Sequence, residues 1–79
     1  MDETKVHDLD YYLSLRYRIV LTPEMEGWSA TMPDLPGCIA VGDSKAETLE
    51  LLEDARRSWL AASLERGLLV PEPDDYTDR

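Results

Sequence analysis

The chain has 79 residues, and its 17 acidic side chains against 8 basic ones give a net charge of −9 at pH 7. This length accommodates one small domain and excludes a second folded module. The charge repels phosphate, so it excludes nucleic-acid binding through a basic patch and favours a basic protein partner. We expect one domain over residues 1–79, with acidic, frayed ends at 1–7 and 74–79.

The cysteine and histidine counts and the lack of long apolar runs exclude several kinds of site and of protein. Cys38 is the only cysteine and His7 the only histidine, so an internal disulfide and a structural zinc site are both excluded. No apolar run approaches the ~20 residues that span a bilayer. The acidic start has no apolar signal core, so the expected location is the cytoplasm, with no membrane association.

The first half of the chain predicts a short helix and a hairpin. Residues 9–15 are apolar at helical spacing, and Asp8 is a suitable N-cap. Residues 16–21 and 28–32 alternate between apolar and polar side chains, which is typical of strands. The segment 22–27 has Pro and Gly near its ends and predicts the loop of an antiparallel hairpin.

The second half predicts a turn, a strand and a long helix. Pro36–Gly37 fits the centre of a type II turn, and residues 38–41 form a short strand. Ser44 and Glu47 form a capping box, which begins a helix that extends to residue 66 and ends at Gly67. Residues 68–70 then add a short fourth strand.

These elements predict an α+β fold: a three-stranded antiparallel meander with one long helix across a face, a short fourth strand and a short N-terminal helix. The second sheet face and the sheet edges have nothing in this chain to cover them. We therefore expect a homo-oligomer, a dimer or higher, or a protein partner. A helical wheel predicts a core face on the long helix made by Leu49, Leu52, Ala55, Trp59, Leu60 and Ala62.

No residue pattern predicts a catalytic, cofactor or metal site. His7 lies in a polar terminal stretch, and Cys38 has neither a second cysteine nor a placed histidine, so a packing thiol is favoured over a reactive one. Asp34, Asp43 and Glu47 offer oxygen ligands for magnesium, but turn and capping roles explain them better. We expect no enzyme activity, and a metal-dependent nuclease is the weakest interpretation.

Four residues are candidates for binding a partner. Trp28 at the start of a strand is either core or an exposed anchor. Asp34, Asp43 and Glu47 flank the third strand, where carboxylates can project past the sheet toward a basic surface. Each of the three acids also has a local structural explanation.

The sequence resembles the HicB-like antitoxins of type II toxin–antitoxin systems. The resemblance rests on the string Pro-Asp-Leu-Pro-Gly-Cys at 33–38, Gly-Asp-Ser at 42–44 and a leucine-rich helix that ends at Gly67. The preceding strands and the tyrosine-rich opening at 11–17 also match, so the resemblance covers most of the chain.

The resemblance implies a β-β-β-α-β domain, likened to a truncated ribonuclease H fold. It implies binding to a small basic HicA-type toxin, an mRNA-cleaving ribonuclease whose RNA-binding and catalytic surface the antitoxin covers. Many family members add a DNA-binding module, and this chain resembles a short form without one, so we expect no direct nucleic-acid contact. The alternative is a stand-alone homo-oligomeric binding or regulatory module with no toxin.

Overall fold

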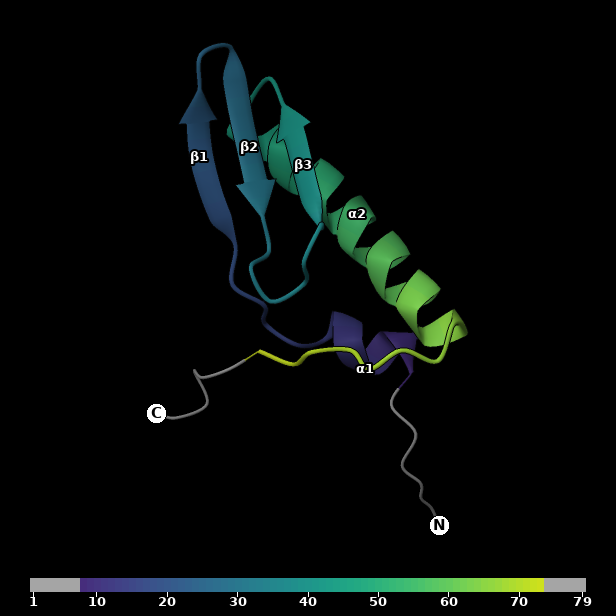
Figure 1. The fold of residues 1–79 in the computed structure, drawn as a ribbon. Helices are drawn as coiled ribbons and strands as arrows, with labels where there is room; N and C mark the ends of the chain where they lie inside the picture. The colour runs from purple at the N-terminus through teal and green to yellow at the C-terminus, as the bar shows by residue number, and fades with distance from the viewer. Residues whose placement is uncertain (1–7, 74–79) are drawn as a thin grey trace.

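The computed structural model describes residues 8–73, which form a three-stranded sheet with a long helix across one face (Figure 1). The strand order is β1-β2-β3, and both neighbouring pairs are antiparallel. These elements confirm the predicted α+β fold, and the ends expected to fray, 1–7 and 74–79, lie outside the described residues. The elements are α1 (Leu9–Leu13), β1 (Val20–Glu24), β2 (Gly27–Thr31), β3 (Ile39–Gly42) and α2 (Lys45–Glu65).

The first strand begins later than its alternating sequence predicted. β1 starts at Val20 and continues through Pro23, so the hairpin loop is only Met25 and Glu26. Tyr17 instead leaves the sheet: its ring is buried and its hydroxyl donates to the carbonyl of Pro71 at 2.6 Å. Pro23 fits in a strand here because β1 is at the edge of the sheet.

The predicted fourth strand at 68–70 does not form. This segment is irregular and passes α1 rather than the sheet (Figure 1), so it has no strand to pair with. Its side chains differ in environment: Leu69 is 97% exposed, whereas Val70 is buried in the core. The Tyr17 hydroxyl and the side chain of Val70 therefore hold the segment in place of a backbone ladder.

Both ends of α2 are set by local sequence, as predicted. The Ser44 hydroxyl accepts from the Glu47 amide at 3.1 Å. The return bond differs from the predicted capping box, because the Glu47 carboxylate accepts from the Asp43 amide at 2.9 Å rather than from Ser44. Gly67 has φ +72°, the left-handed conformation that commonly ends a helix.

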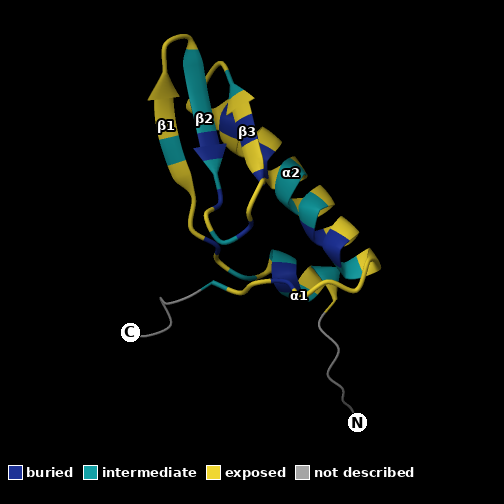
Figure 2. Cartoon of the chain, viewed as in Figure 1, coloured by how far each residue is buried: buried dark blue, intermediate teal, exposed yellow. Residues whose placement is uncertain are grey.

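The core face of α2 is narrower than the helical wheel predicted. Leu52 and Leu60 are fully buried, but Leu49 and Ala62 are exposed. Thr48 and Ser63 occupy buried positions in their place. The helix packs on β2 and β3, so the sheet covers only a limited arc of its surface (Figure 2).

The two faces of the sheet differ in burial. The rung of Leu21, Ala30 and Ala40 shares the face that carries α2, and both alanines are buried. On the opposite face, Ile39 and Val41 are 54% and 65% exposed. Among the described residues nothing covers this second face, as the sequence predicted.

Candidate functional site

The loop at 33–38 is built as a structural support. Leu35 is fully buried, and the loop closes on itself through the Leu35 amide to Met32 at 2.9 Å and the Cys38 amide to Leu35 at 3.0 Å. Trp59 of α2 donates from Nε1 to the Pro36 carbonyl at 2.8 Å. The most specific string of the sequence therefore joins the sheet to the helix.

Asp34 belongs to this support rather than to an open surface. Its side chain is only 15% exposed, and Oδ1 accepts from the Arg18 guanidinium at 3.4 Å. Its other oxygen, Oδ2, is buried without a hydrogen-bond partner among the described residues. Asp34 is therefore poorly placed to meet a partner.

The other three predicted residues gather at the opposite end of the sheet. Trp28 lies opposite Gly42 in the ladder, which places it beside the connection into α2. The Lys45 ammonium lies 5.3 Å from the centre of the Trp28 ring, a cation–π contact. Asp43 and Glu47 are joined by the hydrogen bond that caps the helix. In Figure 1 this end lies away from the loop between β2 and β3.

Trp28 is half-buried, so part of its ring packs against the molecule and part stays exposed. Its ring shares the α2 side of the sheet with Ala30 and Leu21, because alternate residues of a strand point the same way. The exposed part of the ring and the ammonium of Lys45 remain available at the surface.

Exposed acids continue from this end along α2. Glu47, Glu50 and Asp54 are exposed at positions i, i+3 and i+7, so they follow one line of the helix. We call Asp43, Glu47, Glu50 and Asp54 the acidic stripe. Glu50 and Asp54 were not among the predicted partner-binding residues, although their spacing on the polar face of the helix is a signal that could have identified them.

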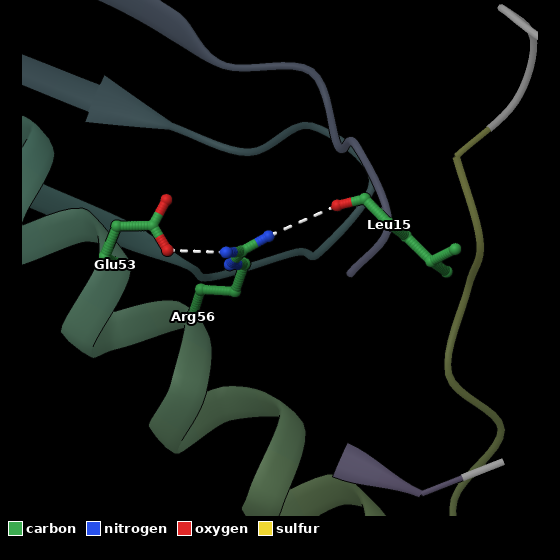
Figure 3. A network of polar contacts seen from close by, with 3 residues as sticks. All are labelled: Leu15, Glu53 and Arg56. Carbon is green, nitrogen blue, oxygen red and sulfur yellow. Dashed lines mark hydrogen bonds and ion pairs between the residues drawn. The ribbon is translucent and has the colours of Figure 1, made fainter. Parts of the chain in front are cut away.

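A buried guanidinium anchors α2 to the segment ahead of β1. The side chain of Arg56 is 13% exposed and pairs with Glu53, with 2.5 Å between Nη2 and Oε1 (Figure 3). Its Nη1 donates to the Leu15 carbonyl at 3.4 Å. Arg56 is thus a structural cation and is not part of a binding surface.

The fold and the sequence have counterparts among known proteins. The family described as the HicB_like antitoxin of bacterial toxin–antitoxin systems matches residues 17–78. The chain belongs to this family. A chain of a solved structure described as a HicA3 and HicB3 toxin–antitoxin complex superposes with a TM-score of 0.65 at 28% identity, covering 75% of this chain and 70% of that one. No curated protein matches the chain.

Membership of the HicB-like family implies a non-catalytic, regulatory protein. The chemistry of Cys38 fits that role: burial raises the pKa of its thiol, which outweighs the opposing effect of the Arg56 charge and keeps the sulfur protonated. Over residues 8–73, no group of three His, Cys, Asp or Glu side chains is arranged to hold a metal ion. No helix in that range is long and apolar enough to cross a membrane.

Proposed function

We propose that this chain is an antitoxin that binds a small basic HicA-type mRNA-cleaving toxin and covers its RNA-binding and catalytic surface. The observation that carries the proposal is the acidic stripe, which is exposed along α2 in a member of an antitoxin family. The similar solved chain comes from a complex of HicA3 with HicB3, which supports a toxin of the HicA type.

The mechanism follows from charge. A surface that binds RNA is basic, and carboxylates compete with phosphates for the same Lys and Arg side chains. The net charge of −9 steers the basic toxin toward the chain. The exposed part of Trp28, beside Lys45 at the start of α2, supplies an aromatic anchor, which is the type of residue enriched at binding hot spots.

The experiment measures binding to the small basic toxin co-expressed from the adjacent reading frame. The double variant Glu50→Gln, Asp54→Asn removes two charges from the stripe without touching the helix cap. Its control, Asp10→Asn with Glu3→Gln, removes two charges from the part of the sequence that precedes β1. We expect the stripe variant to associate at least several-fold more slowly than the control and to inhibit RNA cleavage less.

Equal association rates and equal inhibition for the two double variants would contradict the acidic-stripe mechanism. Asp43→Asn refines the test, because its side chain is exposed and its amide, not its carboxylate, bonds to Glu47. No binding of the toxin by the wild-type chain would favour the second candidate, a stand-alone homo-oligomeric module. The uncovered sheet face is the observation that favours this candidate.

A further inference from the structure

The sheet is wider than the part of it that α2 covers. α2 packs on β3 and β2 rather than on β1, so the helix lies to one side of the sheet (Figure 1). Leu21 and Pro23 point to the α2 side of β1, because Leu21 shares its rung with the two buried alanines and side chains alternate along a strand. Pro23 is exposed and Leu21 is half-buried (Figure 2). The α2 side of β1 is therefore apolar and incompletely covered by the described residues.

One flank of α2 borders this part of the sheet. The Arg56 guanidinium reaches the Leu15 carbonyl ahead of β1, so the flank that carries Arg56 is on the β1 side. Leu49 lies on the same flank, two turns before Arg56, and is 36% exposed. The helix thus presents a partly exposed leucine toward the uncovered side of β1.

Trp28 connects the strand to the helix across this surface. It lies opposite Pro23 in the ladder between β1 and β2. The Lys45 ammonium lies 5.3 Å from the centre of the Trp28 ring, and Leu49 follows Lys45 by one turn of α2. We call Leu21, Pro23, Trp28 and Leu49 the apolar patch. Side chains of β1, β2 and α2 therefore adjoin in one surface that is neither fully buried nor polar.

We propose that the basic toxin rests on the apolar patch, beside α2 and over the α2 side of β1. This inference rests on the proposed function and adds an apolar centre to the contact made by the acidic stripe. Stable interfaces have a desolvated apolar centre surrounded by a polar rim. The stripe consists of exposed carboxylates, and such groups set the rate and the specificity of association more than its strength.

Charge argues for a basic occupant of the patch. Glu53 follows Leu49 by one turn, and its side chain is 54% exposed. Glu50 and Asp54 of the acidic stripe lie on the solvent side of these two residues. Lys45 is the only cation in the sequence 45–55, against four carboxylates. A partner that rests on the patch therefore meets carboxylates along its border with α2, whereas a second copy, which carries −9, would be repelled.

The first test adds one positive charge at matched positions and measures affinity for the toxin co-expressed from the adjacent reading frame. Leu49→Lys changes the patch, and Leu51→Lys changes the opposite flank of α2 at a similar exposure, 41% against 36%. Pro23→Lys and Thr22→Lys make the same comparison on the two faces of β1. A lysine on the patch would be buried against a basic partner, so we expect both patch variants to bind at least about tenfold more weakly. The two controls change the net charge equally and should bind like wild type.

Patch variants that bind as tightly as wild type, or controls that are weakened equally, would overturn the proposal and leave the antitoxin function standing. A wild-type chain that does not bind the toxin would overturn both. A second copy as the occupant would appear in light scattering of the chain alone, as a wild-type dimer that Leu49→Lys dissociates, and would also overturn the proposal.

The second test measures burial of the patch directly and does not require that a lysine be tolerated there. In a Cys38→Ala background, Pro23→Cys and Thr22→Cys each introduce one thiol at an exposed position, on opposite faces of β1. The toxin should slow maleimide labelling of the thiol at 23 at least several-fold and leave labelling at 22 unchanged. Circular dichroism checks that each variant folds. Equal protection of the two thiols, or no protection at 23, would refute the placement of the toxin.

Discussion

At the scale of single residues, the glycine–aspartate pair that precedes α2 has a steric role. Gly42 ends β3 directly beneath the first turn of the helix. A Cβ at this position would lie 2.7 Å from Thr48 Oγ1 and 3.0 Å from the Thr48 amide nitrogen. Thr48 is itself fully buried, with its hydroxyl donating to the Ser44 carbonyl at 2.7 Å, so it has little room to move. The glycine therefore permits the close contact between strand and helix.

Gly42→Ala should lower the melting temperature for this reason. Overpacking at a rigid contact costs roughly 1–3 kcal/mol of unfolding free energy. Gly67→Ala is the comparison variant: its φ of +72° strains an alanine, but a Cβ there meets nothing within 4 Å. An unfolding curve for Gly42→Ala that matches wild type would show that the strand and helix separate easily.

The Tyr17 hydroxyl gives the chain a pH dependence at the alkaline end. Burial, and then the charge of Glu72, raise the pKa of Tyr17 to about 12. The unfolded value is about 10, so the folded state binds this proton more tightly between those two limits. Stability contributed by the neutral phenol is complete below pH 10 and is lost as the pH rises toward 12.

Tyr17→Phe should remove this part of the pH dependence. The variant also loses the 2.6 Å bond to Pro71, which costs about 1 kcal/mol at neutral pH. Denaturant unfolding at neutral pH and above pH 10 measures both effects. If wild type and variant lose stability in parallel above pH 10, Tyr17 is not the titrating group.

At the scale of elements, the features that depend on neighbouring residues could be predicted from the sequence. The features that depend on tertiary contacts could not. The caps of α2 and the stop at Gly67 depend on residues within four positions of each other, and the structure confirms both ends. The start of β1 depends on where the ring of Tyr17 packs. The alternation of apolar and polar residues gives no information about that tertiary contact. The same holds for the candidate site: Asp43 and Glu47 adjoin through the cap, whereas Asp34 pairs with Arg18, which is distant in sequence.

Two leucines of α2 test its packing directly. Leu52 is fully buried and Leu49 is 36% exposed, although the helical wheel placed both on the core face. Leu52→Ala should lower the unfolding free energy by roughly 2–5 kcal/mol. Leu49→Ala should lower it clearly less, because solvent already reaches the side chain of Leu49. Chemical denaturation measures both values. Similar losses of unfolding free energy for the two variants would favour the wider core face that the helical wheel predicted. They would contradict the orientation of α2 in the structure.

At the scale of the whole molecule, the net charge acts in opposite directions on association with a basic toxin and on self-association of the chain. The acidic stripe would meet a basic toxin, so the net charge of −9 assists that association. Self-association would join two copies that each carry −9, so the same charge opposes it. Salt screens both interactions beyond a Debye length of about 10 Å at 0.1 M.

Raising the salt concentration should therefore slow toxin association and strengthen self-association. Sedimentation of the chain alone, at low and at high sodium chloride, measures the dimer dissociation constant, which we expect to fall as salt rises. Stopped-flow mixing with the toxin measures the opposite trend. Toxin association that is equally fast at low and at high salt would contradict steering by the net charge, and a dimer that dissociates as salt is added would be held by ion pairs between copies, which would outweigh the repulsion between their net charges.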